Sequence, residues 1–154
     1  MTADESPVPG GGIPFDELEV GLSAERTTTV TETHLVLFSG LTGDFNPLHV
    51  NEAAAAESLF SGRVAPGILV AGFVSAVLGT KLPGPGCVYM NQTLRFLAPV
   101  RPGQTITARV EVVEIMSDRR RVRLRTTCRP VDGDPVLEGE AEVLIPEPNS
   151  NQED

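Results

Sequence analysis

The run GILVAGFVSAVLGTKL at residues 67–82 decides the fold, because almost every residue in it is apolar. It is too long for a typical strand, and the cluster PGPG at residues 83–86 ends it, so the pattern predicts a helix. A helix without a polar face has to be buried on every side. We therefore expect one central helix that the rest of the domain encloses.

The sequence after this helix is predicted to form β-structure. Apolar and polar residues alternate in four segments, at residues 88–96, 105–116, 119–128 and 136–145. Each segment therefore has one apolar face, and the short connections predict an antiparallel meander. Such a sheet buries its apolar face most simply by wrapping round the apolar helix. The pattern predicts an α+β protein of the hot-dog class, with an antiparallel sheet around a buried central helix.

The length of 154 residues suits a single domain. Residues 1–12 are rich in Gly and Pro and residues 146–154 are polar, so we expect two disordered tails around one domain at 13–145. The longest apolar run is too short to cross a bilayer and no signal peptide is visible, so we expect no membrane partner. Cys87 and Cys128 belong to no CxxC or Cys/His cluster, so we expect no zinc site and a reducing, cytoplasmic setting.

The stretch FSGLTGDFNPLHVNEAAA at residues 38–55 contains the chemically informative residues. A helix is predicted at about residues 32–41, with Thr31 or Thr33 as its N-cap and Gly43 as the residue that ends it in a left-handed conformation. Asn51 reads as the N-cap of a short alanine-rich helix. Pro47 prevents one continuous helix between them, so the intervening segment is predicted to be a tight loop.

Asp44 and His49 lie in this predicted loop, which can bring a carboxylate and an imidazole to one point. At the mouth of an apolar tunnel such a pair can activate water. Gly, Asp, Asn and Pro are also the usual turn residues, so Asp44 could instead only bond its own backbone. The residues alone leave both interpretations open. His34, the other histidine, is expected to be a surface or packing residue.

The same stretch resembles the signature of the MaoC-like (R)-specific enoyl-CoA hydratases, also called type 2 enoyl-CoA hydratases. That signature is an aromatic residue followed by G-D-x-N-P, a hydrophobic residue and His, which residues 38–49 match. The likeness extends over about residues 15–145, and includes RVAPG at 63–67, LPGPG at 82–86 and YMNQTLRFLAPVRPGQTITARVEV at 89–112. It implies a homodimer that reversibly hydrates trans-2-enoyl thioesters of CoA or acyl carrier protein to (3R)-hydroxyacyl products, without a cofactor or metal.

The resemblance also implies roles for individual residues. Asp44 and His49 would hold one water, and we expect Asp44 to act as the base and His49 as the acid. The backbone N–H of Gly67 would donate to the enolate oxygen, and its place at the start of the apolar helix suits a negative charge. Many family members have His-Gly at this turn. This chain has Pro66 there instead, so no side-chain contribution from position 66 is possible.

Asn46 and Ser75 are two further candidates, as substrate-binding residues. Asn46 would orient the pair or the water, and Ser75 on the apolar helix matches a family hydroxyl near the pair. Each could equally be structural.

Three other functions stay open at this point. One is a (3R)-hydroxyacyl-carrier-protein dehydratase with the same pair, another is thioester hydrolysis, and a third is a non-catalytic acyl-thioester-binding subunit. The formal net charge of −9 argues against nucleic acid as a partner. Nine of the 12 Lys and Arg residues nevertheless lie at 95–129, either as a solvated strand face or, for some of them, as ligands of carrier phosphates.

Overall fold

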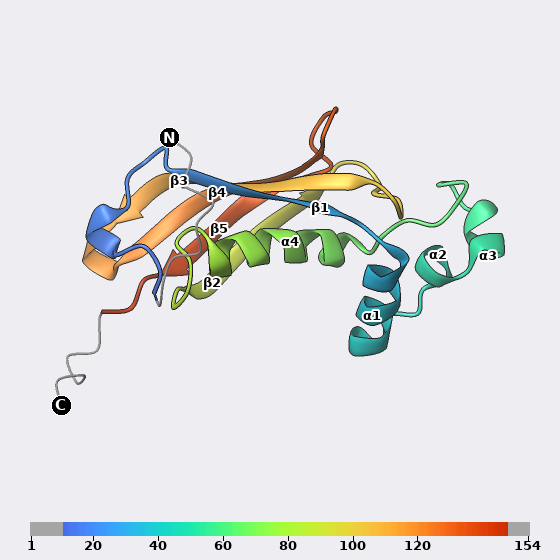
Figure 1. Cartoon of the computed structure of the whole chain (residues 1–154), viewed down its shortest axis with the longest axis horizontal. Coiled ribbons are helices and arrows are strands. Elements are labelled where there is room, and N and C mark those ends of the chain that lie inside the picture. Colours follow the sequence, from blue (N-terminus) through green and yellow to red (C-terminus); the bar gives the residue numbers. More distant parts are fainter. Residues whose placement is uncertain (1–10, 148–154) are drawn as a thin grey trace.

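The computed structural model of the chain describes residues 11–147. A five-stranded sheet lies over one helix, and three shorter helices extend beyond one end of the sheet (Figure 1). The predicted tails lie largely outside the described residues. The elements follow in chain order: a 3-10 turn at Phe15–Glu17, β1 Ser23–Thr29, α1 Glu32–Thr42, α2 Pro47–Val50, α3 Glu52–Ala56, α4 Gly67–Thr80, β2 Val88–Phe96, β3 Thr105–Met116, a 3-10 turn at Ser117–Arg119, β4 Arg121–Pro130 and β5 Leu137–Leu144.

The strands follow the order β1-β3-β4-β5-β2, and every neighbouring pair is antiparallel. The meander is therefore real for β3, β4 and β5. The prediction is wrong for β2, which pairs with β5 at the far edge and not with its successor β3. The connection at residues 97–104 contains two prolines and cannot form a tight hairpin. It is tied instead to the start of α4, where Ala65 N–H donates to the carbonyl of Val100 at 2.7 Å.

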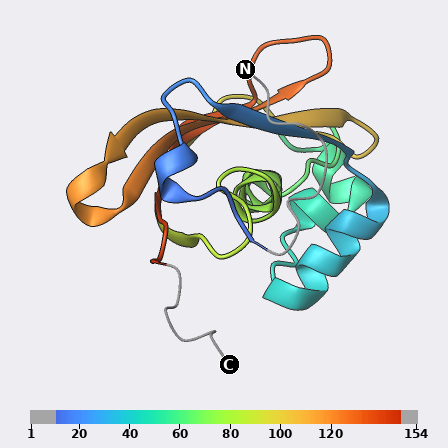
Figure 2. The ribbon, with the colours of Figure 1, turned by 60° about the vertical axis from the view of Figure 1, so that its left-hand side comes forward.

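One face of the sheet forms the core with α4, as the alternation predicted. The expected inward residues of β3, β4 and β5 are buried, and the sheet curves around α4 when the helix is viewed nearly end-on (Figure 2). This confirms the hot-dog fold. The β2 strand differs, because it is an edge strand with a bulge between Tyr89 and Asn91, and Val88, Met90 and Phe96 remain exposed.

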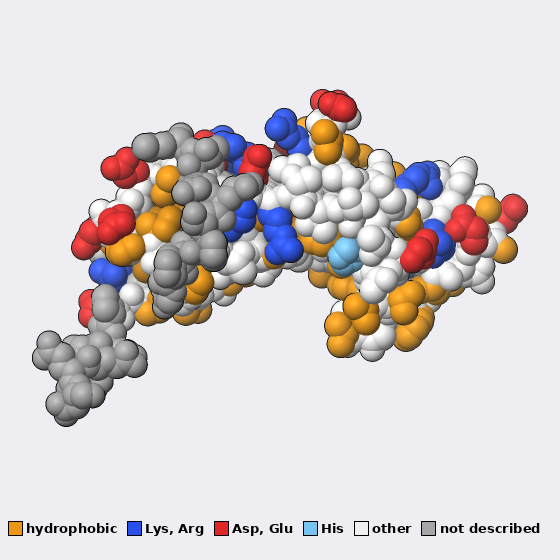
Figure 3. All heavy atoms as spheres, viewed as in Figure 1, with side chains coloured by type: hydrophobic (Ala, Val, Ile, Leu, Met, Phe, Trp, Pro, Cys, Tyr) orange, Lys and Arg blue, Asp and Glu red, His pale blue; other side chains and the backbone are white. Residues whose placement is uncertain are grey.

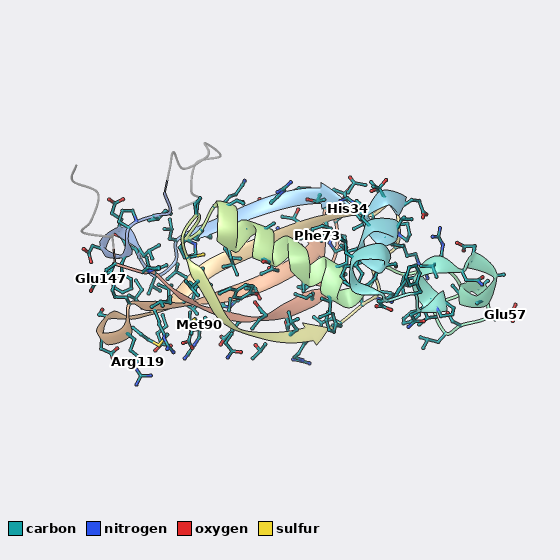
Figure 4. The ribbon with its side chains drawn as sticks, turned by 90° about the horizontal axis from the view of Figure 1, so that it is seen from below. His34, Glu57, Phe73, Met90, Arg119 and Glu147 are labelled. Carbon is teal, nitrogen blue, oxygen red and sulfur yellow. The ribbon has the colours of Figure 1, made fainter. Side chains whose placement is uncertain are left out.

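The central helix α4 is buried on one side only within a single chain. Val70, Val74, Val77 and Leu78 face the sheet. The opposite side is uncovered, which corrects the expectation of burial on every side (Figure 4). It is a stripe at helical spacing formed by Ile68, Gly72, Ser75 and Gly79. Of the helices within residues 11–147, none has both the length and the apolar character to span a bilayer.

The ends of α1 are capped as the sequence predicted. The Thr31 side chain accepts from the backbone N–H of His34, and Gly43 ends the helix with a φ of 77°. His34 closes a capping box, because the backbone N–H of Thr31 donates to its Nδ1 at 2.9 Å. The His34 ring also contacts Phe73 of α4 edge-on, with centroids 5.9 Å apart (Figure 4). His34 therefore has a structural role in joining α1 to α4.

The pairing of β2 with β5 depends on a glycine. Gly139 of β5 lies opposite Leu94, and a Cβ at position 139 would overlap the carbonyl oxygen of Thr93. Only a residue without a side chain therefore permits β5 to approach β2 so closely.

Candidate active site

A single helical turn positions the candidate histidine. The segment predicted to be a tight loop contains α2, Pro47–Val50, with Pro47 at the first helical position. Asn46 is its N-cap, because the Asn46 Oδ1 accepts from the backbone N–H of Leu48 at 3.1 Å. The prediction missed this turn because four residues are too few for a periodic signal. The turn presents His49 toward the loop that precedes α4.

The two carboxylate oxygens of Asp44 point to different partners. Oδ1 accepts from the backbone N–H of Asn46 at 3.2 Å, which is the local turn bond that the residue types suggested. Oδ2 lies 3.9 Å from the Nε2 of His49. The structural and functional interpretations of Asp44 are therefore compatible, because each uses a different oxygen.

The imidazole of His49 is held through its other nitrogen. Nδ1 lies 2.7 Å from the carbonyl oxygen of Val64. A carbonyl can only accept, so Nδ1 carries a proton in both the neutral and the charged ring. Nε2 is therefore the atom of His49 that gains or loses a proton. The His49 side chain is only 12% exposed, whereas that of Asp44 is 43% exposed.

The separation of Nε2 and Oδ2 suits a shared water. At 3.9 Å the two atoms are too far apart for a direct hydrogen bond. A water oxygen at about 2.8 Å from each of them would satisfy both at ordinary hydrogen-bond distances. The pair can thus hold one water between a carboxylate and an imidazole.

An apolar pocket of about 390 Å³ is lined by His49 of this pair but not by Asp44. His49 and Gly67 both line it, so the structure brings these two predicted residues to one cavity. The remaining wall is almost entirely apolar and comes from the loops around the start of α4 and the end of β2, with Leu48, Phe60, Val64, Ala65, Ile68, Val70, Phe96, Leu97, Ala98, Pro99, Val100, Val136 and Leu137. Such a cavity excludes water and strengthens the polar interactions at its mouth.

Gly67 is the first residue of α4, directly after Pro66 as N-cap. The first N–H groups of a helix have no partner inside the helix, and the helix dipole favours negative charge near them. A Cβ at position 67 would lie 2.7 Å from Cε1 of Phe96, so a side chain there would displace that ring. Phe96 was not expected at the site, and only its aromatic character at the end of β2 could have suggested it.

Ser75 and Asn46 lie apart from the pocket. Ser75 is exposed on the uncovered side of α4, eight residues beyond Gly67, and it does not line the pocket. Eight residues of helix correspond to about 12 Å. Asn46 uses its side-chain oxygen as a helix cap and does not line the pocket either. Val64 was missed at the sequence level because its contribution is a backbone carbonyl, which no residue type reveals.

Most of the clustered arginines face acidic side chains. Six of the nine lie within 4.0 Å of a carboxylate, namely Arg95, Arg109, Arg119, Arg121, Arg123 and Arg125. This favours the solvated strand face over a phosphate site. Within residues 11–147 no three His, Cys, Asp or Glu side chains form a group that could hold a metal ion.

Comparisons with known proteins identify the family of the chain. The model of the MaoC like domain matches residues 16–132. An (R)-specific enoyl-CoA hydratase from Rhodospirillum rubrum is 50% identical over 86% of this chain and 91% of its own length. A 3-hydroxybutyryl-CoA dehydratase from Methylorubrum extorquens is 48% identical over 86% of this chain and 83% of its own.

Solved structures give the same result. An R-hydratase from Pseudomonas aeruginosa superimposes with a TM-score of 0.83 at 43% identity, over 89% of this chain and 88% of the other. An (R)-hydratase from Aeromonas caviae gives a TM-score of 0.81 at 37% identity, over 84% and 98% of the two chains. The chain therefore belongs to the MaoC-like family, the hot-dog hydro-lyases that include these hydratases and dehydratases.

Proposed function

We propose that this protein reversibly hydrates trans-2-enoyl thioesters of coenzyme A to (3R)-hydroxyacyl thioesters. The observation that carries the proposal is the Asp44–His49 pair, 3.9 Å apart, whose His49 lines an apolar pocket together with Gly67. The relatives named as enoyl-CoA hydratase and 3-hydroxybutyryl-CoA dehydratase support the substrate class and the reversibility. The (3R) configuration rests on the relatives alone.

In the proposed mechanism Asp44 is the base and His49 the acid. Asp44 Oδ2 takes one proton from the shared water as the water oxygen bonds to Cβ. The imidazolium Nε2 of His49 gives its proton to Cα. The proton on Asp44 then returns to Nε2 across the short gap, and the pair is ready for the next turnover. Throughout the cycle, the carbonyl of Val64 accepts from Nδ1, so it also stabilises the positive charge on the ring.

The negative charge of the reaction develops on the thioester oxygen. As the water oxygen bonds to Cβ, the electron pair of the double bond moves toward the carbonyl and forms an enolate. The N–H of Gly67, at the start of α4, is our candidate donor to this oxygen. The thioester itself accepts the charge, so the proposed reaction requires no cofactor or metal.

A carrier-protein substrate is the alternative that the comparisons support. A 3-hydroxyacyl-[acyl-carrier-protein] dehydratase of Solanum lycopersicum is 33% identical over 84% of this chain and 78% of its own length. Six of the nine clustered arginines already face carboxylates, which disfavours a large basic surface for a carrier protein. We therefore prefer the CoA thioester. The presence of both acid and base argues against thioester hydrolysis and against a non-catalytic subunit.

We also propose that the protein acts as a homodimer. Within residues 11–147, several surfaces of one chain are uncovered. They include the α4 stripe of Ile68 and small residues, and the exposed side chains of edge strand β2. Hydrophobic side chains also gather on the overhanging helices (Figure 3), where Val36, Leu37 and Leu41 of α1 and Phe45 after it are exposed. A second copy that covered the α4 stripe would bury Ser75, and the hydroxyl could then meet a site on the partner. The free thiols of Cys87 and Cys128 fit a reducing compartment such as the cytoplasm.

The decisive experiment follows the loss of enoyl absorbance when the purified protein is mixed with crotonyl-CoA. We expect the absorbance to fall to an equilibrium value, and chiral analysis to give the (3R) product. Asp44→Asn serves as the matched control. The same assay with the crotonyl group on acyl carrier protein distinguishes the two carriers. Release of free CoA with no 3-hydroxyacyl product would show a hydrolase instead.

A further inference from the structure

The loop between α3 and α4, residues 57–66, joins several parts of the molecule. It contains Val64, whose carbonyl accepts from His49 Nδ1. It also contacts the starts of α1 and α3 and the connection between β2 and β3. The position of the Val64 carbonyl therefore depends on whatever fixes this loop.

Arg63, the residue before Val64, uses its guanidinium to bind two carboxylates from different helices. Nη1 and Nη2 donate to the two oxygens of Glu32, at 2.9 and 2.6 Å, and Nε donates to Glu52 at 2.7 Å. Glu32 is the first residue of α1 and Glu52 the first residue of α3. The paired guanidinium holds the pKa of Glu32 below its ordinary value, and the two carboxylates raise that of Arg63. One side chain thus links two helices to the loop.

A second arginine fixes the same loop from the sheet. Arg101, in the connection between β2 and β3, donates from Nη2 to the carbonyl of Phe60 and, more weakly at 3.5 Å, from Nη1 to that of Arg63. The loop is therefore fixed to the helices through Arg63 and to the connection between β2 and β3 through Arg101.

The fixed loop meets the histidine turn through two reciprocal hydrogen bonds. The backbone N–H of Val64 donates to the carbonyl of Leu48 at 3.1 Å. The Val64 carbonyl accepts from the side chain of the next residue, His49, at 2.7 Å. The Val64 carbonyl belongs to the Val64–Ala65 peptide, whose N–H also donates to the carbonyl of Val100 at 2.7 Å. A shift of the loop at Val64 would therefore change the hydrogen bond that places the proton on Nδ1.

We propose that Arg63 is a positioning residue for His49, because it fixes the loop next to Val64 against two helices and thereby keeps Nε2 free to exchange protons at the site. The expected effect of Arg63 on turnover rests on the proposed function, whereas its expected effect on the tautomer of His49 does not. Two carboxylates already face the positive charge of Arg63, which disfavours a role as a phosphate ligand. Nor does the ion pair act chiefly on stability, because Glu32 and Glu52 are largely exposed and such pairs contribute little.

The test uses the only two histidines of the chain as opposite reporters. Long-range nitrogen–proton NMR at high pH, where imidazoles are neutral, identifies which ring nitrogen carries the proton. In the wild type we expect Nδ1–H for His49. For His34 we expect Nε2–H, because Nδ1 accepts from the backbone of Thr31. The variants are Arg63→Gln, Arg63→Lys and the control Arg121→Gln, which breaks an arginine–glutamate pair of 2.7 Å between β4 and β5.

In Arg63→Gln we expect His49 to become a mixture of tautomers while His34 keeps its own. We expect kcat to fall about 10-fold with little change in KM, less than the roughly 10²-fold cost of a 1 Å misplacement. Arg63→Lys should lie in between, because an ammonium cannot reproduce the bidentate pair. Arg121→Gln should alter neither quantity. An unchanged His49 tautomer in folded Arg63→Gln would overturn the proposal.

Three further outcomes keep the conclusions separate. If Arg63→Gln does not fold, Glu52→Gln removes one of the two carboxylate partners of Arg63. We then expect a smaller shift of the His49 tautomer in the same direction. The absence of any shift would overturn the proposal. If the tautomer responds but the wild type does not hydrate enoyl thioesters, the positioning role stands and the proposed function fails. If hydration is robust and neither kcat nor the tautomer responds, the positioning role fails alone.

Discussion

At the scale of single residues, Asp44 shows how one side chain serves the fold and the proposed chemistry together. Oδ1 accepts from the backbone of Asn46 and Oδ2 faces His49. A carboxamide at position 44 can keep the first bond, but it cannot take a proton from water. Replacement by asparagine therefore separates the two roles.

Asp44→Asn and His49→Ala are each expected to lower kcat by about 10²–10⁴-fold. The melting temperature of Asp44→Asn should stay near that of the wild type, because the local turn bond remains. The double variant should lose little more than the worse single one, because the two groups act on the same water. Crotonyl-CoA turnover and thermal unfolding on the same preparation measure kcat and the melting temperature. Near wild-type turnover in either single variant would remove the pair from the mechanism.

His34→Ala is the matched control on the other histidine. The sequence suggested a surface or packing residue, and the structure gives His34 a capping and packing role in α1. We now expect kcat per folded enzyme to stay unchanged and stability to fall by about 1 kcal/mol, as for a lost cap. A loss of kcat comparable to that of His49→Ala would contradict the assignment of His49 as the acid.

Gly67→Ala is expected to lower kcat/KM at least 10-fold, since the new methyl group would displace the Phe96 ring beside the pocket. Alanine retains the backbone N–H, so this loss alone says little about the enolate oxygen. In the double variant Gly67→Ala/Phe96→Ala, activity should recover to near that of Phe96→Ala. A double variant as slow as Gly67→Ala would mean that the N–H itself has moved. That result would support its proposed role as a donor to the enolate oxygen.

At the scale of elements, the sequence predicted the structure where burial imposes a regular alternation of apolar and polar residues. The inward faces of β3, β4 and β5 and the caps of α1 and α3 could all be predicted, because alternation and capping are local. The place of β2 could not, since pairing with β5 depends on a long-range contact at Gly139. The candidate pair was visible as a motif, but the Val64 carbonyl and the Arg63 network depend on loops that meet only in the folded chain.

The buried thiol of β4 offers a test of the packing between strand and helix. Cys128 is fully buried, its Sγ lies 3.7 Å from the carbonyl of Val70 in α4, and burial raises its pKa to about 12. Since the thiolate is the reactive form, Cys128 should resist an aromatic disulfide reagent at pH 8 until the protein unfolds. Cys87 is only half-buried and should react first. Measured in Cys87→Ser, rapid labelling of native Cys128 would contradict this packing.

At the scale of the whole molecule, the uncovered side of α4 predicts assembly. Sedimentation should report twice the chain mass for the wild type. Gly72→Arg should shift it to the monomer, because it places a charged side chain on the α4 stripe. The isolated chain has room for it, since a Cβ at Gly72 meets nothing within 4 Å. Gly72→Ala is the matched control and should stay dimeric. A stable, active wild-type monomer would exclude the proposed dimer.

The absence of space at Gly139 has a consequence for how this sequence can vary. In a library of all single substitutions, position 139 should tolerate none, since even a methyl group would overlap the Thr93 carbonyl and separate β2 from β5. Gly72, also inside a regular element, should accept alanine freely in the same library. Position 139 would thus accept no side chain at all, whereas position 72 would accept a small one. Substitutions at position 139 would therefore be selected against because they disrupt the sheet, whether or not they affect the active site.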